Sequence, residues 1–320
     1  MKLIRQKYNY HVSLDTVEEF EKIILSDASV TSINETNKTF SKILFHLWNV
    51  VTRNKVTSKN NRDLAKKFKI HLLAVLMGTN FSKCLPRFFS KSNKSIYIFD
   101  AWPEKHDEII KFVNGFKVDN LFLTSSQAVE AIRSKTPNTN CFWVSEGINP
   151  GGYKHYSFKD KTIDVLALGR KYESYHAQIV SCLEFNKKEY LYEKQPGKII
   201  FPTREGFVKG MAKSKISICV PSSITHPERS GNIETMTIRY LQSMVSKCLI
   251  LGHAPKEMIT LFGYNPVIEI DTKDPEGQII SILNNYSDYF PLIEKNYQKV
   301  LENHTWTNRW NTIKQFLNQN

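Results

Sequence analysis

Two polar side chains lie eight residues apart in a segment that carries a helical pattern of apolar residues. Ile238, Leu241 and Val245 recur at the spacing of one helix face, so that face is expected to pack inward. At about 100° per residue, Glu234 and Gln242 fall roughly 40° to either side of Ile238, at the borders of this face. A carboxylate or an amide at such a border needs a polar partner, which can be protein or ligand.

The segment is read as a helix from Glu234 that runs into an apolar strand ending at Gly252. Gly231 and Asn232 make the preceding loop flexible, and a helix N-terminus attracts a diphosphate. Eight residues of helix span about 12 Å, comparable to the span from ribose to sugar in a nucleotide-diphosphate sugar. The side chains expected to point away from the core are Tyr240, Ser243 and Lys247.

A Gly-Arg-Lys triplet ends the apolar run of residues 163–168. Gly169 permits a close backbone approach, Arg170 supplies a planar hydrogen-bonding fork, and Lys171 adds a second cation. The triplet is therefore a candidate phosphate-binding corner at the end of a buried strand.

Asp100 directly follows another apolar run, residues 96–99. Open parallel sheets bind ligands at the carboxyl ends of their strands, so Asp100 is a candidate acceptor-activating base or sugar ligand. In the alternative interpretation it caps a helix that starts near Pro103. Trp102 can stack on a sugar face or pack in the core.

Short apolar runs separated by helix-like segments predict parallel sheets of the Rossmann type. A polar run with Pro150 and two glycines marks a linker, so we place a domain boundary near residue 155. The predicted strands are 71–77, 95–99, 120–123, 141–144, 163–168, 215–220, 249–252 and 267–270. The predicted helices include 17–25, 40–51, 204–212, 255–262, 275–283, 289–303 and 306–317.

Composition favours a globular protein. The chain has 320 residues, 41% of them hydrophobic, which is enough for two domains. No run approaches a membrane span, and the first seven residues lead into no apolar run of a signal peptide, so we predict a cytoplasmic protein. The five cysteines are scattered without metal-ligand spacing and are interpreted as reduced core thiols.

The net charge of +13 is concentrated in one block. Arg53 to Lys94 contains eleven Lys or Arg against one acid, Asp63. Such a block can meet an anionic membrane surface, a polyphosphate or nucleic acid, or it can be a solvated lysine-rich face. It lacks the periodic aromatic residues of a stacking platform, so no nucleic-acid partner is predicted.

Residues 237–250 resemble the Arg, aromatic, apolar, Glu, small-residue and Gly pattern of GT-B glycosyltransferases, the glycosyl transferases group 1 type with a spore-coat-protein-like (CgeB-like) C-terminal domain. Residues 304–310 are similar to the terminal His-Thr-aromatic and Arg signature of that family. The resemblance also covers residues 146–149 and 163–170. It implies an α/β fold of two Rossmann-like domains, with parallel sheets that face an interdomain cleft and a C-terminal helix that crosses back.

The resemblance also implies domain and residue roles. It divides the chain into an acceptor-side domain, 1–155, a donor-binding domain, 156–303, and a returning helix, 304–320. Glu234 would meet the transferred sugar, and Gln242 stands where the family has a second Glu that holds the ribose. Arg170 and Lys171 would neutralise the departing diphosphate, together with Arg239. The backbone N–H groups offered to the phosphates are those of Thr235, Met236 and Thr237.

We therefore predict a glycosyltransferase of the hexosyltransferase type. It would move a sugar from a nucleotide-diphosphate sugar to a glycan or lipid-linked acceptor, in bacterial surface polysaccharide biosynthesis, with retention and with neither metal nor cofactor. A further hypothesis is that the protein docks on the inner face of the membrane through this basic block. The alternatives are another GT-B nucleotide-sugar enzyme such as an epimerase, and a basic, non-catalytic binding protein.

Overall fold

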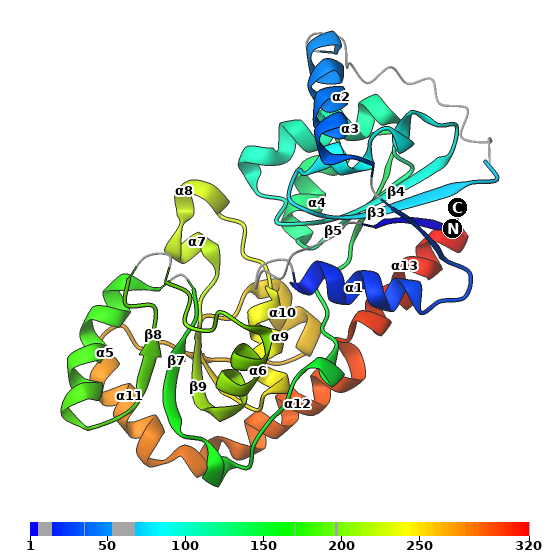
Figure 1. Ribbon diagram of the computed structural model, residues 1–320. Coiled ribbons are helices and arrows are strands. Elements are labelled where there is room, and N and C mark those ends of the chain that lie inside the picture. The colour runs from blue at the N-terminus through cyan, green and yellow to red at the C-terminus, as the bar shows by residue number, and fades with distance from the viewer. Residues whose placement is uncertain (6–14, 35, 53–67, 170, 196–197, 320) are drawn as a thin grey trace. The chain divides into compact units, whose positions relative to one another are not determined.

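Two parallel sheets carry the architecture of the protein (Figure 1). The computed structural model describes residues 1–5, 15–34, 36–52, 68–169, 171–195 and 198–319. Their contacts divide the chain into two units, and each is described by itself. The first unit combines Met1–Glu146, Arg229–Ile233 and Arg309–Asn320, and the second combines Gly147–Glu228 and Glu234–Asn308.

The first unit holds a six-stranded sheet of order β2-β1-β3-β4-β5-β6, in which every pair of neighbouring strands is parallel. Its strands are β1 (Lys2–Arg5), β2 (Thr31–Asn34), β3 (His71–Met77), β4 (Asn93–Phe99), β5 (Asn120–Leu123) and β6 (Asn140–Trp143). Its helices are α1 (Asp15–Leu25), α2 (Lys38–Val51), α3 (His106–Phe116) and α4 (Ser126–Arg133), joined by the 3₁₀ turns η1 (Phe81–Cys84), η2 (Arg87–Phe89) and η3 (Pro103–Lys105). Four predicted strands are present, but β1 and β2 were missed because they form no apolar run: KLIR holds two apolar residues and TSIN one.

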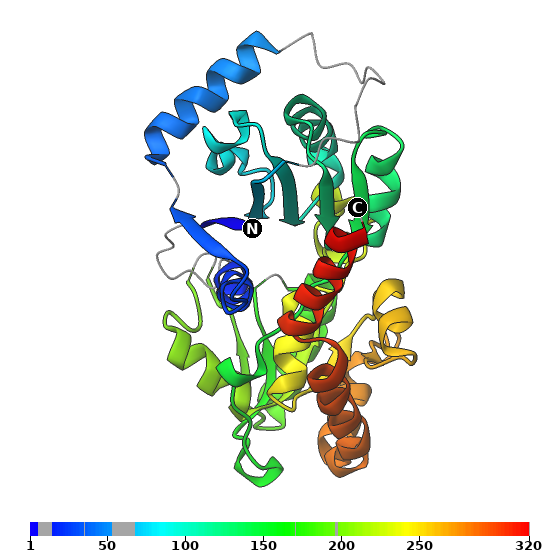
Figure 2. The same cartoon turned by 90° about the vertical axis from the view of Figure 1, so that its right-hand side faces the viewer.

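Aromatic side chains fill the core of the first unit on the α2 and α3 side. The rings of Phe81 and Phe112 stack with centroids 4.0 Å apart, and Trp48 of α2 lies 4.8 Å from Phe116. Phe45 packs against the same Phe81 and Phe112 pair. Aromatic packing and the hydrogen bond of the Ser41 hydroxyl to the Leu85 carbonyl, at 2.9 Å, hold helix α2 to the unit, and Figure 2 shows the helix at the periphery of this unit.

The second unit holds a five-stranded parallel sheet of order β11-β10-β9-β7-β8. Its strands are β7 (Ile163–Ala167), β8 (Tyr190–Tyr192), β9 (Ser214–Cys219), β10 (Leu249–Gly252) and β11 (Ile268–Glu269). The helices from residue 173 onward are α5 (Glu173–Phe185), α6 (Arg204–Lys213), α7 (Ser222–Thr225), α8 (Pro227–Ser230), α9 (Ile238–Val245), α10 (Lys256–Phe262), α11 (Pro275–Asn284), α12 (Phe290–Asn303) and α13 (Trp306–Gln319). The prediction of parallel sheets of the Rossmann type is confirmed.

The end of the chain packs within the first unit. The Arg309 side chain donates to the carbonyl of Glu146 at 3.1 Å. The Trp310 indole and the Lys314 ammonium both donate to the Asp27 carboxylate at 3.0 Å. The predicted bounds of the three domains stay a prediction.

The basic block does not form one charged surface in the part of the chain that is described. Residues 53–67, which hold six of the eleven Lys and Arg of the block, lie outside the described residues. Lys94 is buried, and its ammonium donates to the carbonyl of Ser92 at 3.3 Å. Lys69, Arg87 and Lys91 are exposed. No helix in the described residues is long and apolar enough to cross a membrane.

A buried lysine ties three parts of the second unit together. The Lys161 ammonium donates to the carbonyls of Ala212 at 3.0 Å, Ser214 at 2.8 Å and Ser246 at 2.9 Å. These carbonyls lie at the end of α6, the start of β9 and the end of α9, and burial lowers the pKa of the lysine. Three carbonyls at one ammonium compensate much of the cost of burying the charge.

We expect Lys161→Met to destabilise the fold, because it leaves three buried carbonyls without their donor. The free energy of unfolding should fall by about 3 kcal/mol. Urea denaturation followed by circular dichroism measures it. The control is Lys159→Met at an exposed position, which should leave the midpoint unchanged. Equal urea midpoints for Lys161→Met and Lys159→Met would contradict the proposed contribution of the Lys161 hydrogen bonds to stability.

Candidate functional site

Gly169 and Arg239 meet at the carboxyl edge of the second sheet. Gly169 follows β7 with φ +67°, a conformation that favours glycine. A Cβ atom built at this position would lie 3.2 Å from Nη2 of Arg239. The guanidinium thus lies against the glycine backbone, and a side chain at position 169 would displace it.

The charge of Arg239 also reaches the end of the neighbouring strand. Burial raises the pKa of the Cys219 thiol at the end of β9, and the positive charge of Arg239 opposes that rise. Arg239 is the second residue of α9, so its guanidinium lies close to the N-terminus of that helix. A cation, a helix N-terminus and an exposed glycine backbone are three features that favour phosphate binding.

The other two residues of the predicted phosphate-binding corner are Arg170 and Lys171. Arg170 lies outside the described residues. The Lys171 ammonium lies 3.6 Å from Oε1 of Glu173 and 5.5 Å from the centroid of the Tyr192 ring. The phosphate-binding roles of Arg170 and Lys171 stay predictions.

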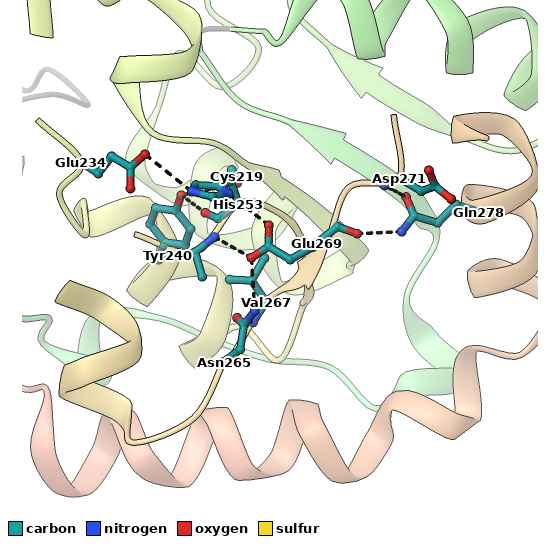
Figure 3. A network of polar contacts seen from close by, with 10 residues as sticks. Cys219, Glu234, Tyr240, His253, Asn265, Val267, Glu269, Asp271 and Gln278 are labelled. Atoms are coloured by element: carbon teal, nitrogen blue, oxygen red, sulfur yellow. Dashed lines mark hydrogen bonds and ion pairs between the residues drawn. The ribbon is translucent and has the colours of Figure 1, made fainter. Parts of the chain in front are cut away.

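A histidine lies between two carboxylates at the end of β10. Nε2 of His253 is 3.6 Å from Oε1 of Glu234, and Nδ1 is 3.1 Å from Oε2 of Glu269 (Figure 3). The Tyr240 hydroxyl donates to the His253 carbonyl at 2.7 Å, and the backbone N–H of Ala254 donates to Glu269 at 3.1 Å. The ring therefore links Glu234 to the edge strand β11.

The segment before α9 is not helical, so the predicted helical start at Glu234 is wrong. Helix α9 begins at Ile238, with Thr237 at the N-cap. The Thr235 hydroxyl and the Met236 N–H both donate to Oε1 of Glu257, at 2.8 and 2.9 Å. A buried carboxylate thus occupies the Met236 N–H for which a phosphate was predicted, and it anchors the segment before the helix.

Gln242 is buried, and its amide has a protein partner. Nε2 donates to the hydroxyl of Tyr153 at 3.1 Å. Arg204 donates to the same hydroxyl at 3.1 Å and lies over the tyrosine ring, 4.5 Å from its centroid. The role of Gln242 in holding a ribose stays a prediction.

The predicted outward direction of Tyr240 and Ser243 is wrong, because both are buried. The Ser243 hydroxyl donates to the Arg239 carbonyl at 2.9 Å, and its oxygen lies 2.8 Å from the Ser217 hydroxyl, with which it shares a hydrogen bond. Strand β9 and the loop after β10 therefore pack against the side of α9 that was predicted to face away from the core.

The remaining candidates lie in the first unit. The Asp100 carboxylate is 3.7 Å from the Arg229 guanidinium, which also lies 5.6 Å from the Trp102 ring centroid. Asp100 has φ +52°, and Trp102, not Asp100, is the N-cap residue of η3. Gly231 and Asn232 belong to this unit, where the Asn232 carbonyl accepts from the Gln127 amide at 3.0 Å.

Sequence reasoning missed His253, Glu257 and Glu269. One signal was available for His253, because it directly follows the apolar run 249–252 as Asp100 follows 96–99. No local pattern identifies Glu257, whose partners precede it by more than twenty residues.

No family model matches the sequence, and no curated protein matches it. Solved structures do match. Anabaena Alr3699/HepE in complex with UDP-glucose has a TM-score of 0.59 at 9% identity, over 100% of this chain and 99% of that chain. Sucrose-phosphate synthase from Thermosynechococcus elongatus has a TM-score of 0.62 at 8% identity, over 99% of this chain and 98% of that chain.

The match to TarM covers 77% of this chain and 54% of that chain, with 13% identity and a TM-score of 0.49. The chain has the GT-B fold of its solved neighbours, which are built of two Rossmann-like domains. The predicted resemblance to GT-B glycosyltransferases is thereby confirmed, while the CgeB-like C-terminal domain stays a prediction.

We expect Glu257→Ala to release the segment before α9, because the Thr235 hydroxyl and the Met236 N–H lose their shared acceptor. The free energy of unfolding should fall by about 2 kcal/mol, and amide exchange at Met236 should accelerate. Hydrogen–deuterium exchange with urea denaturation measures both. Glu276→Ala, at an exposed position of α11, is the control, and unchanged exchange at Met236 would disprove the anchoring role.

Proposed function

We propose that the protein is a glycosyltransferase that uses a nucleotide-diphosphate sugar as its donor. The observation that carries the proposal is the contact of the Arg239 guanidinium with the Gly169 backbone, at the carboxyl edge of a parallel sheet and beside the N-terminus of α9. In open α/β sheets this edge is where ligands bind. The GT-B fold supports the proposal, and one of the similar structures holds UDP-glucose.

The proposed reaction breaks the bond between the anomeric carbon and the β-phosphate oxygen, and the new glycosidic bond forms to an acceptor oxygen. Negative charge grows on the departing diphosphate and must be met by fixed donors. Arg239 supplies a planar cation, and the α9 N-terminus adds partial positive charge. Arg170 and Lys171 are proposed as further cations at the same corner.

Glu234 is proposed to contact the transferred sugar through hydrogen bonds to its hydroxyl groups. His253 bridges Glu234 and Glu269, so it is proposed as the residue that orients the Glu234 carboxylate. Gln242 is proposed for the ribose, where an amide can both donate to and accept from a diol. Thr235 and Thr237 remain proposed backbone donors.

The acceptor is proposed to bind the first unit, with Asp100 as the base that takes the proton of the acceptor hydroxyl. Asp100 follows β4 with the positive φ given above, a conformation that clusters at functional positions. Its neighbour Trp102 packs in the core of the first unit, with the Arg229 guanidinium 5.6 Å from its ring centroid. We infer a glycan or lipid-linked acceptor, transfer with retention and no metal, in bacterial surface polysaccharide biosynthesis.

The donor corner is tested by ligand binding with Arg239→Gln. Wild-type protein should show a raised melting temperature with UDP or UDP-glucose, because a ligand that binds only the folded state stabilises it. Arg239→Gln should weaken the affinity by about tenfold or more, since it removes a charge-assisted phosphate contact. Arg133→Gln in α4 is the matched control. Equal affinity of Arg239→Gln and wild type would remove Arg239 from the site.

The role of Glu234 is tested by turnover. Glu234→Ala should abolish sugar transfer and donor hydrolysis while the melting temperature of the free protein stays within a few degrees of wild type. A screen of UDP, GDP, ADP, CMP and dTDP sugars selects the donor, and release of the nucleotide is then measured. The control is Glu276→Ala, which should keep full turnover. Undiminished turnover of Glu234→Ala would overturn the assignment.

A further inference from the structure

A cavity of about 300 Å³ lies at the surface of the second unit. We call it the tyrosine cavity, and its lining includes three tyrosines, a lysine and a histidine, namely Tyr153, Tyr156, Tyr297, Lys154 and His155. It is also lined by Val245, the last residue of α9, which lies six residues and about 9 Å along the helix from Arg239. The cavity is therefore at the opposite end of α9 from the proposed donor corner.

Three polar groups of the lining residues have no protein partner within the described part of the chain. Lys154 is exposed, and its ammonium forms neither an ion pair nor a hydrogen bond with a described residue. The Tyr156 and Tyr297 hydroxyls likewise form no hydrogen bond with a described residue, whereas the Tyr153 hydroxyl accepts from the Gln242 amide at 3.1 Å. One ammonium and two hydroxyls can therefore donate to a bound molecule, and the hydroxyls can also accept from it.

The charge around the tyrosine cavity is positive. The Lys247 ammonium lies 4.4 Å from the centroid of the Tyr297 ring and is neutralised by Glu294, whose Oε2 is 2.7 Å away. Because this ion pair is balanced, the lysine of the cavity itself carries the excess charge. Burial lowers the pKa of His155, and the charges of Lys247 and Lys161 lower it further, while the charge of Glu294 opposes them. An anionic ligand suits such surroundings.

We propose that the tyrosine cavity binds a phosphate ester of a sugar, with its phosphate at Lys154 and its hydroxyl groups at Tyr156 and Tyr297. A cavity of this volume is at the small end of ligand pockets, which suits a single sugar ring. The aromatic side chains offer apolar faces to the C–H groups of that ring. An uncharged apolar ligand is disfavoured, because it would remove water from the ammonium without replacing it. A free sugar phosphate and a nucleoside monophosphate share this chemistry.

This site goes beyond the proposed transfer reaction and does not depend on it. None of the described residues assigned to the donor corner lines the tyrosine cavity. Binding is measured without a nucleotide-diphosphate sugar and without an acceptor, so failure of this proposal and failure of the glycosyltransferase proposal are distinguishable.

Isothermal titration calorimetry with glucose 6-phosphate tests the site in the full chain. The test variants are Lys154→Gln, which removes the charge, and Tyr297→Phe, which removes one hydroxyl and keeps the ring. The matched controls are Lys159→Gln, at an exposed position of the same segment, and Tyr289→Phe, at a half-buried position of the 3₁₀ turn η6 (Tyr286–Tyr289).

Wild type should bind glucose 6-phosphate at one site per chain. Lys154→Gln should weaken the affinity by about tenfold or more, since it removes a charge-assisted contact, and Tyr297→Phe by about fivefold, since it removes one hydrogen bond. Both controls and Arg239→Gln should bind as wild type does. The proposal is overturned by absence of saturable binding to wild type, by equal affinities of Lys154→Gln and wild type, or by a loss of binding in Arg239→Gln alone.

Further probes separate the parts of the ligand. Glucose alone and inorganic phosphate alone should each bind at least about tenfold more weakly than the ester. An ester that binds no more tightly than inorganic phosphate would overturn the assignment of a sugar ligand. UMP is titrated into Arg239→Gln, so that the donor corner does not contribute. Tighter binding of glucose 6-phosphate than of UMP would identify a free sugar phosphate and the reverse a nucleoside monophosphate, and either supports the shared chemistry.

The imidazole of His155 gives a local readout of binding. A bound phosphate should offset the charges of Lys247 and Lys161, so the pKa of His155, measured by NMR, should rise when glucose 6-phosphate is present. The His155→Gln variant assigns the resonance. An unchanged pKa of His155 on saturation would place the ester elsewhere and refute the proposal.

Discussion

The Glu257 carboxylate anchors the segment that leads into α9, beside the proposed donor site. Its Oε1 atom accepts from both the Thr235 hydroxyl and the Met236 N–H, and the side chain is buried on α10. These two contacts anchor the segment that leads into α9, which begins at Ile238. The first turn of α9 carries Arg239, while Glu234 lies in the irregular segment before it.

The backbones of β9 and β10 also pack closely at this end of the sheet. Gly252 ends β10 so near to Cys219 of β9 that a Cβ atom would overlap the Cys219 carbonyl. Only glycine, which has no side chain, fits at this position. The carbonyl of the next residue, His253, accepts a hydrogen bond from the buried Tyr240 of α9. The histidine ring is then placed between Glu234 and Glu269, so one glycine, one tyrosine and one carboxylate determine where the polar groups converge. The proposed donor corner uses a cation, a glycine backbone and a helix N-terminus, which suit a compact anion.

The sequence by itself determined the alternation of strands and helices, the parallel sheets and the GT-B resemblance, because apolar periodicity is a local property that packing preserves. It also identified Gly169 and Arg239 as candidates, and they lie together. It did not determine where α9 begins, which side of α9 is buried or what Gln242 contacts. Those features involve contacts with Glu257, Ser217 and Tyr153, which are 21 to 89 residues away in the chain. A hydrogen bond between distant residues leaves no periodic signal, so only the tertiary structure could decide them.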